Sequence, residues 1–181
     1  MEILQNLSVK DLNFKKTKEK MSEHKKNYII TSKKGERIKI IINKGIIPFG
    51  YESYNGTNVL NIEINPELGN DHYNIFSYIQ SFESEFVEKN NIQCNQVNND
   101  IEGKEYYLNM KKSKGGYIIR SYVFGNPEIF ININKFKTLL TSNDIKKTIA
   151  NIELALGTLW INDNNYGFLW YVRKIEVLHN Y

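Results

Sequence analysis

The C-terminal part of the chain constrains the fold most strongly, because it joins two apolar runs through a polar turn. Residues 154–161 and 168–178 are rich in aromatic and β-branched side chains, and residues 162–167 between them are mostly Asn and Gly. Asn and Gly accept the positive φ of tight turns, so this pattern predicts a β-hairpin. Trp160 and Trp170 both lie in it. We interpret them as core residues, with stacking on a flat ligand as the alternative.

Short alternating segments indicate that most of the chain forms strands. Residues 36–43 alternate strictly, with isoleucine on one face and mainly polar or charged side chains on the other. Further strands are predicted at 28–31, 59–64, 105–111, 117–124 and 129–136. Many short strands with turn signals between them are typical of a sandwich or a small barrel.

One helix is predicted, from Asp71 as its N-cap to about residue 90. Its apolar residues recur at helical spacing and define a single buried face: Ile75, Ile79, Phe82 and Phe86. The acidic residues Asp71, Glu83 and Glu85 are expected to face solvent. Residues 142–153 fit a helix and a strand equally well. The overall prediction is a mainly β domain with one helix.

Length and charge describe one domain with a mild basic excess. The chain has 181 residues and a net charge of +4. Its basic residues gather in 10–37 and 104–120, which fits a polyanionic partner and equally fits an ordinary surface. We expect residues 1–27 to form a polar, basic surface segment or mobile arm, and residues 28–181 to form the folded domain.

The remaining composition points to an intracellular, soluble protein. Because Cys94 is the only cysteine, no internal disulfide can form, and a reducing compartment is expected. No segment approaches the roughly 18 apolar residues of a membrane span. The first residues lack the pattern of a signal peptide.

No motif for catalysis or for a metal is present. His24, His72 and His179 are scattered, without acidic or cysteine partners at ligand spacing. Phosphate-binding glycine motifs and a nucleophile elbow are absent, and Cys94 has no nearby histidine. We therefore expect a protein that is not an enzyme and that needs no cofactor.

The hairpin predicted across residues 112–116 has the most informative surface. Tyr107, Asn109 and Lys111 share one side of its first strand. The second strand carries on one side Ile118, Arg120, Tyr122 and Phe124. Aromatic rings interleaved with cations suit single-stranded nucleic acid, because rings stack on bases while cations contact phosphates. The alternative is ordinary strand composition, since tyrosine favours strands and cations favour solvent.

The order of the motifs resembles a known family. A short N-terminal segment and a strand with cations are followed by a strand, the helix and the Lys/Tyr-rich hairpin. The short motifs that carry the resemblance are Leu12-Asn13-Phe14, Ile47-Pro48-Phe49-Gly50, and the closing residues 159–161, 166–170 and 175–177. The whole resembles the single-stranded-DNA-binding proteins of large cytoplasmic DNA viruses, which are similar to the podophage type.

This resemblance implies a fold, a function and partners. The fold is the OB-fold, a five-stranded Greek-key barrel, here with an added hairpin and one α-helix, and residues 147–161 are then a strand. The function is sequence-tolerant binding of single-stranded DNA in viral DNA replication, recombination or repair, with replication proteins and a second copy as further partners. Unlike the phage-type proteins, this chain has no acidic tail in residues 175–181.

The prediction for the binding surface combines both arguments. The residues predicted to bind nucleic acid are Arg37, Lys39, Tyr107, Lys111, Lys112, Tyr117, Arg120, Tyr122 and Phe124. The rival hypothesis is a β-rich structural or assembly protein that binds other proteins, in which aromatics belong to the core and to interfaces. Sequence does not separate DNA from RNA, because stacking and phosphate contacts serve both.

Overall fold

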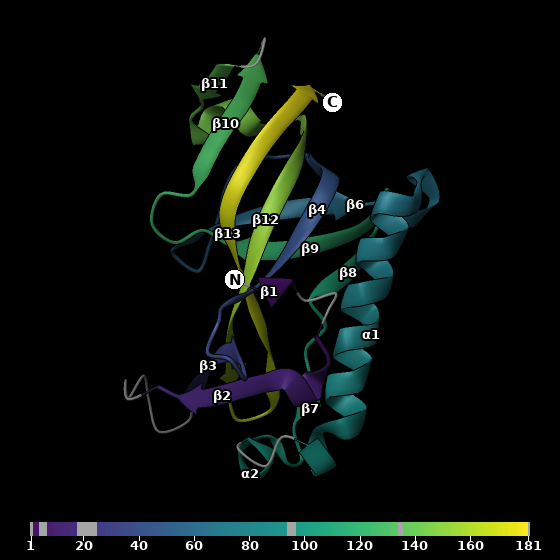
Figure 1. Ribbon diagram of the computed structural model, residues 1–181, viewed down its shortest axis with the longest axis vertical. Coiled ribbons are helices and arrows are strands. Elements are labelled where there is room, and N and C mark those ends of the chain that lie inside the picture. Colours follow the sequence, from purple (N-terminus) through teal and green to yellow (C-terminus); the bar gives the residue numbers. More distant parts are fainter. Residues whose placement is uncertain (1, 4–6, 18–24, 94–96, 134–135, 181) are drawn as a thin grey trace. The chain divides into compact units, whose positions relative to one another are not determined.

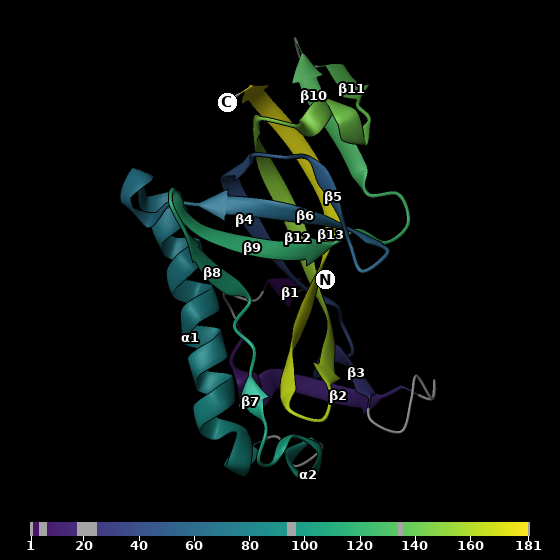
Figure 2. The same cartoon turned by 180° about the vertical axis from the view of Figure 1, so that it is seen from behind.

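The computed structural model describes residues 2–3, 7–17, 25–93, 97–133 and 136–180 (Figures 1 and 2). The expectations for His24 and Cys94 lie outside these residues. The helices are α1 (Asn70–Gln93) and α2 (Asn98–Ile101), with short 3-10 turns η2 (Val9–Asp11), η3 (Pro66–Leu68) and η4 (Ser142–Ile145). The strands are β1 (Glu2–Ile3), β2 (Leu12–Lys16), β3 (Lys26–Ser32), β4 (Ile38–Ile47), β5 (Tyr51–Tyr54), β6 (Thr57–Ile64), β7 (Glu105–Tyr106), β8 (Met110–Ser113), β9 (Gly116–Tyr122), β10 (Glu128–Ile133), β11 (Phe136–Leu139), β12 (Thr148–Ile161) and β13 (Asn165–Asn180). The predicted fold class, mainly β with one long helix, is confirmed.

The chain divides into two compact units, and each is assembled from three separate segments. The first unit contains residues 1–40, 78–109 and 156–169. The second unit contains residues 41–77, 110–155 and 170–181. The long elements α1, β4, β12 and β13 each contribute one part to each unit.

The second unit contains a closed five-stranded barrel. Strand β4 pairs with β6, β6 with β9, β9 with β13, β13 with β12, and β12 with β4. The β4–β6 and β6–β9 pairs are antiparallel, whereas β9 and β13 run parallel through the pair Tyr122 and Tyr171. Numbered along the chain, the barrel strands close in the order 1-2-3-5-4-1, which is the Greek-key arrangement of the OB-fold. The hairpin β10–β11 is attached to the barrel through β13.

The core of this barrel is formed by the side chains that point inward at alternate positions of its strands. Leu60, Ile62 and Ile64 of β6 are fully buried, and Ile119 of β9 is buried opposite Ile62. Trp170 is 1% exposed, which confirms the interpretation of this tryptophan as a core residue. The segment 142–153, which fitted both helix and strand, forms η4 and the first part of β12.

The hairpin β8–β9 forms where a hairpin was expected, with a difference in its first strand. Gly116 has φ of +142°, and a Cβ there would lie 2.3 Å from the carbonyl oxygen of Ile64, so only glycine fits this close approach. Residues 105–111 do not form the one strand that was predicted. They are split between β7, which pairs with β13, and β8, which pairs with β9.

The first unit has an aromatic core around the second half of α1. Phe86 packs against Phe14 and Phe168, with ring centroids 5.9 and 4.7 Å apart. The predicted apolar face of the helix is confirmed, since all four of its residues are buried. Asp71 lies inside the first turn of the helix and not at its N-cap, because α1 begins one residue earlier.

Strand β2 lies inside the N-terminal segment, where no regular element was expected. It pairs with β3 in antiparallel register, and Leu12 and Phe14 are buried. Two apolar residues separated by one polar residue are too short a pattern to indicate a strand among so many lysines.

Glu83 is buried in the first unit, which corrects the expectation that it faces solvent. Its side chain is 3% exposed. Its Oε1 accepts hydrogen bonds from the Tyr106 hydroxyl at 3.0 Å, from the Asn109 backbone N–H at 3.1 Å and from Asn109 Nδ2 at 2.7 Å. Burial raises the pKa of the Glu83 carboxyl, and these hydrogen bonds act in the opposite direction.

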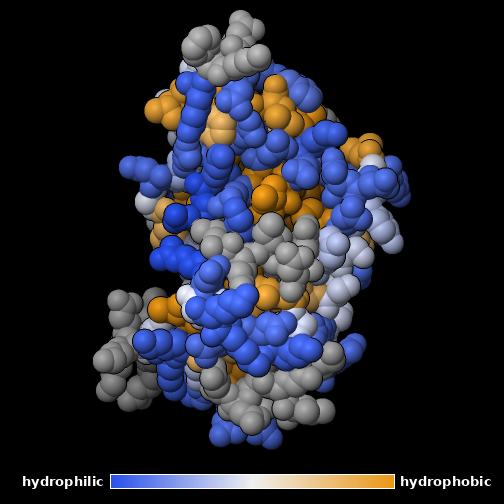
Figure 3. All heavy atoms as spheres, in the orientation of Figure 1, coloured by the Kyte–Doolittle hydropathy of each residue, from blue (hydrophilic) through white to orange (hydrophobic). Residues whose placement is uncertain are grey.

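The surface is mixed in polarity. On the face drawn in Figure 3, hydrophilic side chains predominate and hydrophobic ones show in smaller areas among them. Among the described helices, none has the length and apolar character needed to cross a membrane.

Candidate nucleic-acid interface

The outer side of the barrel carries aromatic and charged side chains on neighbouring strands. Register pairs place Asn61 beside Arg120, and Ile118 beside Lys111, while Tyr122 is paired with Val59. Because paired residues project to the same side of a sheet, these side chains share one face. Figure 2 shows β5, β6 and β9 side by side. We call this surface the aromatic face and define it by Glu52, Tyr54, Asn61, Glu63, Lys111, Arg120, Tyr122, Phe124, Tyr171 and Arg173.

Arg120 is held in place at the middle of the aromatic face. Its guanidinium lies over the Tyr54 ring, 4.5 Å from the centroid, and its Nε donates to Asn61 Oδ1 at 3.2 Å. The Asn61 amide in turn donates to the Glu52 carboxylate. Tyr54 is 42% exposed, so the cation rests on a ring that itself faces solvent. Such a guanidinium is oriented before any ligand arrives, which lowers the entropy lost on binding.

Three aromatic rings adjoin one another at the end of β9. Phe124 is 57% exposed. Its ring is nearly parallel to that of Tyr122, with centroids 6.2 Å apart and an 18° interplanar angle, and it meets Tyr171 edge-on at 5.1 Å. These contacts fix the orientation of Phe124 while much of its ring stays open to solvent. An exposed, fixed ring is suited to stacking on a flat ligand.

The charges on the aromatic face are mixed. Lys111 and Arg173 are exposed cations on β8 and β13. Glu52 and Glu63 contribute carboxylates on β5 and β6, and Glu63 lies against Gly115, where a Cβ would collide with its Oε1. The face therefore offers cations for phosphates without forming a uniformly basic groove.

Four of the predicted site residues lie on one face within the second unit. Lys111, Arg120, Tyr122 and Phe124 share the aromatic face. Tyr117 and its register partner Lys112 project to the opposite side of β9 and β8, and the Tyr117 ring packs on Phe76 with centroids 4.5 Å apart. Arg37, Lys39 and Tyr107 belong to the first unit.

Sequence reasoning missed the contributions of β5 and β13 to this face. Tyr171 and Arg173 alternate with the buried residues Trp170 and Val172, so their outward direction was readable from the chain. What could not be read was the parallel pairing that places Tyr171 beside Tyr122. Tyr54 follows a proline-containing bend and carries no pattern of its own.

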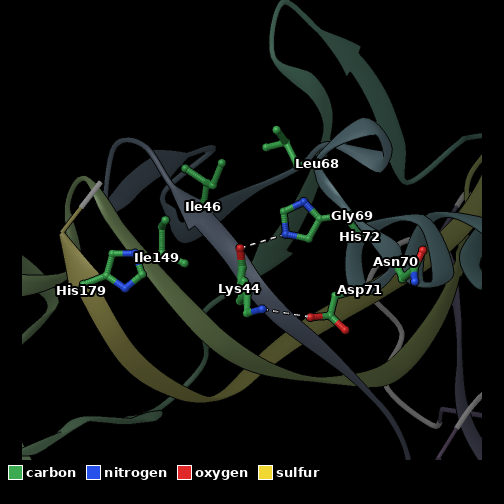
Figure 4. A pocket seen from close by; sticks show the side chains of 9 residues that line it. All are labelled: Lys44, Ile46, Leu68, Gly69, Asn70, Asp71, His72, Ile149 and His179. Atoms are coloured by element: carbon green, nitrogen blue, oxygen red, sulfur yellow. Dashed lines mark hydrogen bonds and ion pairs between the residues drawn. The ribbon is translucent and has the colours of Figure 1, made fainter.

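A pocket of about 380 Å³ lies elsewhere on the second unit (Figure 4). It is lined by Lys44, Ile46, Leu68, Gly69, Asn70, Asp71, His72, Ile149 and His179. His72 Nδ1 accepts from the Asn65 N–H at 2.9 Å, so Nε2 carries the hydrogen and donates to the Lys44 carbonyl oxygen at 2.9 Å. Lys44 Nζ lies 3.5 Å from Asp71. Both nitrogens of His72 thus serve to hold β4 against the start of α1.

Within the ranges that the structure describes, no three His, Cys, Asp or Glu side chains come together as metal ligands would. No known family model matches the chain, and no curated protein matches it. Among solved structures, the chain is similar to the single-stranded DNA-binding protein from bacteriophage Enc34, solved in complex with ssDNA. The identity is 11%, the TM-score is 0.45, and the match covers 93% of this chain and 97% of that one. A likeness of this degree assigns neither a family nor a function.

Proposed function

We propose that this protein binds single-stranded DNA through the aromatic face, with little preference for sequence and without enzymatic activity. The observation that carries the proposal is the exposed, fixed ring of Phe124 beside Tyr122 and Tyr171, next to the oriented guanidinium of Arg120. The face lies over the second and third strands of the barrel, β6 and β9. In OB-folds this is the face that binds oligonucleotides.

Each group on the face has a role in this proposal. Phe124 and Tyr122 stack on bases, and stacking is worth about 1–3 kcal/mol per base, with every base offering a π-face. Arg120, Lys111 and Arg173 contact phosphates. Asn61 and Tyr54 are positioning residues, since they hold the Arg120 guanidinium. Single strands suit this surface better than duplex DNA, in which the bases already stack on one another.

The biological setting belongs to the same proposal. The resemblance in motif order implies a role in protecting single strands during viral DNA replication, recombination or repair. The same resemblance implies a five-stranded barrel, which is the fold of the second unit. Replication proteins and a second copy of the chain as partners stay predictions.

The proposal is tested by fluorescence-anisotropy titration of labelled dT oligonucleotide, matched duplex DNA and poly-U, at two salt concentrations. We expect salt-sensitive binding to dT and much weaker binding to duplex, because phosphate contacts release counterions. Comparable binding of poly-U would extend the function to RNA. Absence of binding to all three at low salt would contradict the proposal and favour the rival, a β-rich assembly protein that uses this face to bind another protein.

A further inference from the structure

A second exposed aromatic surface lies on the first unit and is built from other strand positions than the aromatic face. It is the outer side of the sheet formed by β12, β3 and β2. Residues 28, 30 and 32 of β3 are buried, so their neighbours project outward, and Ile29 is 48% exposed. Register pairs place Trp160 beside Asn27, and Ile29 between Thr158 and Lys15. We call this surface the Trp160 face.

Trp160 occupies a fitted position on this face. Its neighbours Leu159 and Ile161 are buried, whereas Trp160 is only half-buried. A Cβ at Gly167 would lie 3.1 and 3.2 Å from atoms of the Trp160 ring and 3.1 Å from the Tyr107 carbonyl oxygen. The indole therefore lies directly against the backbone at Gly167, at a position where a Cβ would make tighter than ordinary contact.

Tyr107 completes an aromatic pair with Trp160. The two rings meet edge-on, with centroids 5.9 Å apart at 61°, and Tyr107 is 42% exposed. The turn between β12 and β13 is secured nearby, because Lys104 Nζ donates to the carbonyl oxygens of Asn162 and Asp163 at 2.6 and 2.7 Å. The pair thus has a fixed geometry and an open side.

The polar groups of the Trp160 face select the class of ligand. Its outward strand positions are Asn13, Lys15, Asn27, Ile29, Thr31, Thr158 and Trp160, and none of these is a carboxylate. The cation can contact a phosphate, and the amide and hydroxyl groups can hydrogen-bond to base edges. The two adjoining rings can stack on base faces. The absence of acidic groups from these positions favours an anionic ligand over a basic one.

We infer that the Trp160 face is a second contact surface for single-stranded DNA, in which bases stack on Trp160 and Tyr107. This inference rests on the proposed function. It explains why the sequence carries exposed aromatics in both units, and it assigns Tyr107 to a different surface from Tyr122 and Phe124.

Intrinsic tryptophan fluorescence can report on DNA binding at this surface. Trp170 is 1% exposed and Trp160 is half-buried, so a base that stacks on an indole meets Trp160. We expect titration with unlabelled dT oligonucleotide to quench the intrinsic tryptophan fluorescence, at the same DNA concentrations at which a labelled oligonucleotide shows binding by anisotropy. The variant Trp160→Phe should bind DNA but lose the quenching, which assigns the signal.

Affinity measurements provide the second readout. Tyr107→Ala should raise the Kd for dT by about 5- to 140-fold, the loss expected for one stacked base. Tyr73→Ala is the matched control, because Tyr73 is a 56% exposed tyrosine on α1. Circular dichroism melts of both variants are the control, and they should show that the fold is kept.

The outcomes separate this inference from the proposed function. Binding by anisotropy with unchanged tryptophan fluorescence, and an unchanged Kd for Tyr107→Ala, would overturn the Trp160 face and leave the aromatic face standing. No binding by anisotropy would overturn the proposed function and this inference with it.

Discussion

The guanidinium of Arg120 lies over the ring of Tyr54, with its Cζ 4.5 Å from the ring centroid. The two residues come from β9 and β5, which do not pair with each other but flank β6 on its two sides. A cation held over an exposed ring costs little to desolvate and keeps its outer edge available to a phosphate.

Arg120→Ala is expected to weaken binding of dT by about 1–2 kcal/mol at low salt, because one oriented phosphate contact is lost. The slope of log K against log salt should also fall by about 0.7, the value for one phosphate on a single strand. Titrations at four salt concentrations measure both quantities. Lys33→Ala, at an exposed lysine of the turn before β4, is the control. An unchanged slope in Arg120→Ala would remove this residue from the phosphate contacts.

Phe124→Ala and Tyr122→Ala are each expected to weaken binding by about 1–3 kcal/mol, the worth of one stacked base. Phe124 is 57% exposed, so its truncation should leave the melting temperature nearly unchanged. Anisotropy titration and thermal melts check the two statements. Equal affinity of Phe124→Ala and the unaltered protein would show that bases do not stack on this ring.

Glu63→Gln is expected to strengthen binding by about 0.5–1 kcal/mol, because it removes one negative charge from the aromatic face. The gain should shrink as salt is added, since exposed charges are screened. Glu67→Gln, at an exposed position of η3, changes net charge equally and is the control. If both variants gain the same affinity, the effect belongs to net charge and not to this face.

The buried carboxyl of Glu83 is expected to make stability fall as pH rises. Its folded-state pKa is raised by burial above the ordinary value of 4.5, so the folded protein holds this proton more tightly than the unfolded chain does. The stabilisation is complete below pH 4.5 and is lost as pH rises toward the folded-state pKa. Urea denaturation between pH 4 and pH 8 should show this trend. Glu83→Gln, which keeps an acceptor for Tyr106 and Asn109, should flatten it; an equal slope in both proteins would contradict the assignment.

The carboxylate of Asp100 is expected to have the opposite effect to Glu83: it should make stability fall as pH falls. Its carboxylate accepts hydrogen bonds from Lys26 at 2.5 Å, from Lys16 at 3.3 Å and from the Tyr28 hydroxyl. Although burial acts to raise the pKa of Asp100, these donors outweigh it and lower the value to about 2, from 3.8. The stability that they supply is therefore present above pH 3.8 and lost as pH falls through about 2.

Asp100→Asn should lower the free energy of unfolding by about 1–2 kcal/mol at pH 7. Of the donors to this carboxylate, Lys16 should contribute least to stability, because its side chain is 55% exposed. Acid denaturation of the variant should be correspondingly less steep between pH 4 and pH 2. An unchanged free energy of unfolding at pH 7 would show that the cluster adds nothing to stability.

Local pattern was sufficient for α1 and for most of the longer strands, but it missed β2 and the break between β7 and β8. It was also insufficient to predict which elements pack against one another. The alternation in β6 and the helical spacing of Phe82 and Phe86 indicated which side chains are buried, and the structure confirms these predictions. Glu83 was placed in solvent because a carboxylate on a helix is usually exposed. Its burial depends on contacts with Tyr106 and Asn109, which lie in residues 105–111, a segment expected to form one strand of the hairpin.

The grouping of the predicted site residues also differs from the expectation, while their role in binding stays a prediction. Tyr107 and Tyr122 were assigned to one hairpin, but the first strand of that hairpin is interrupted between β7 and β8. Pairing of β7 with β13 then places Tyr107 beside Trp160. Such pairings between distant segments cannot be predicted from local alternation, because the alternating pattern of a strand does not depend on which strand it pairs with.

Each unit is made of three stretches of chain that interleave with those of the other. No single cut in the gene can therefore release one unit intact, and neither can be gained or lost on its own by recombination at one boundary. A ribosome must also complete residue 170 before the last stretch of the barrel unit exists at all. During synthesis the barrel can therefore close only after β13 has been made, and the aromatic face, which includes Tyr171 and Arg173, is completed only then.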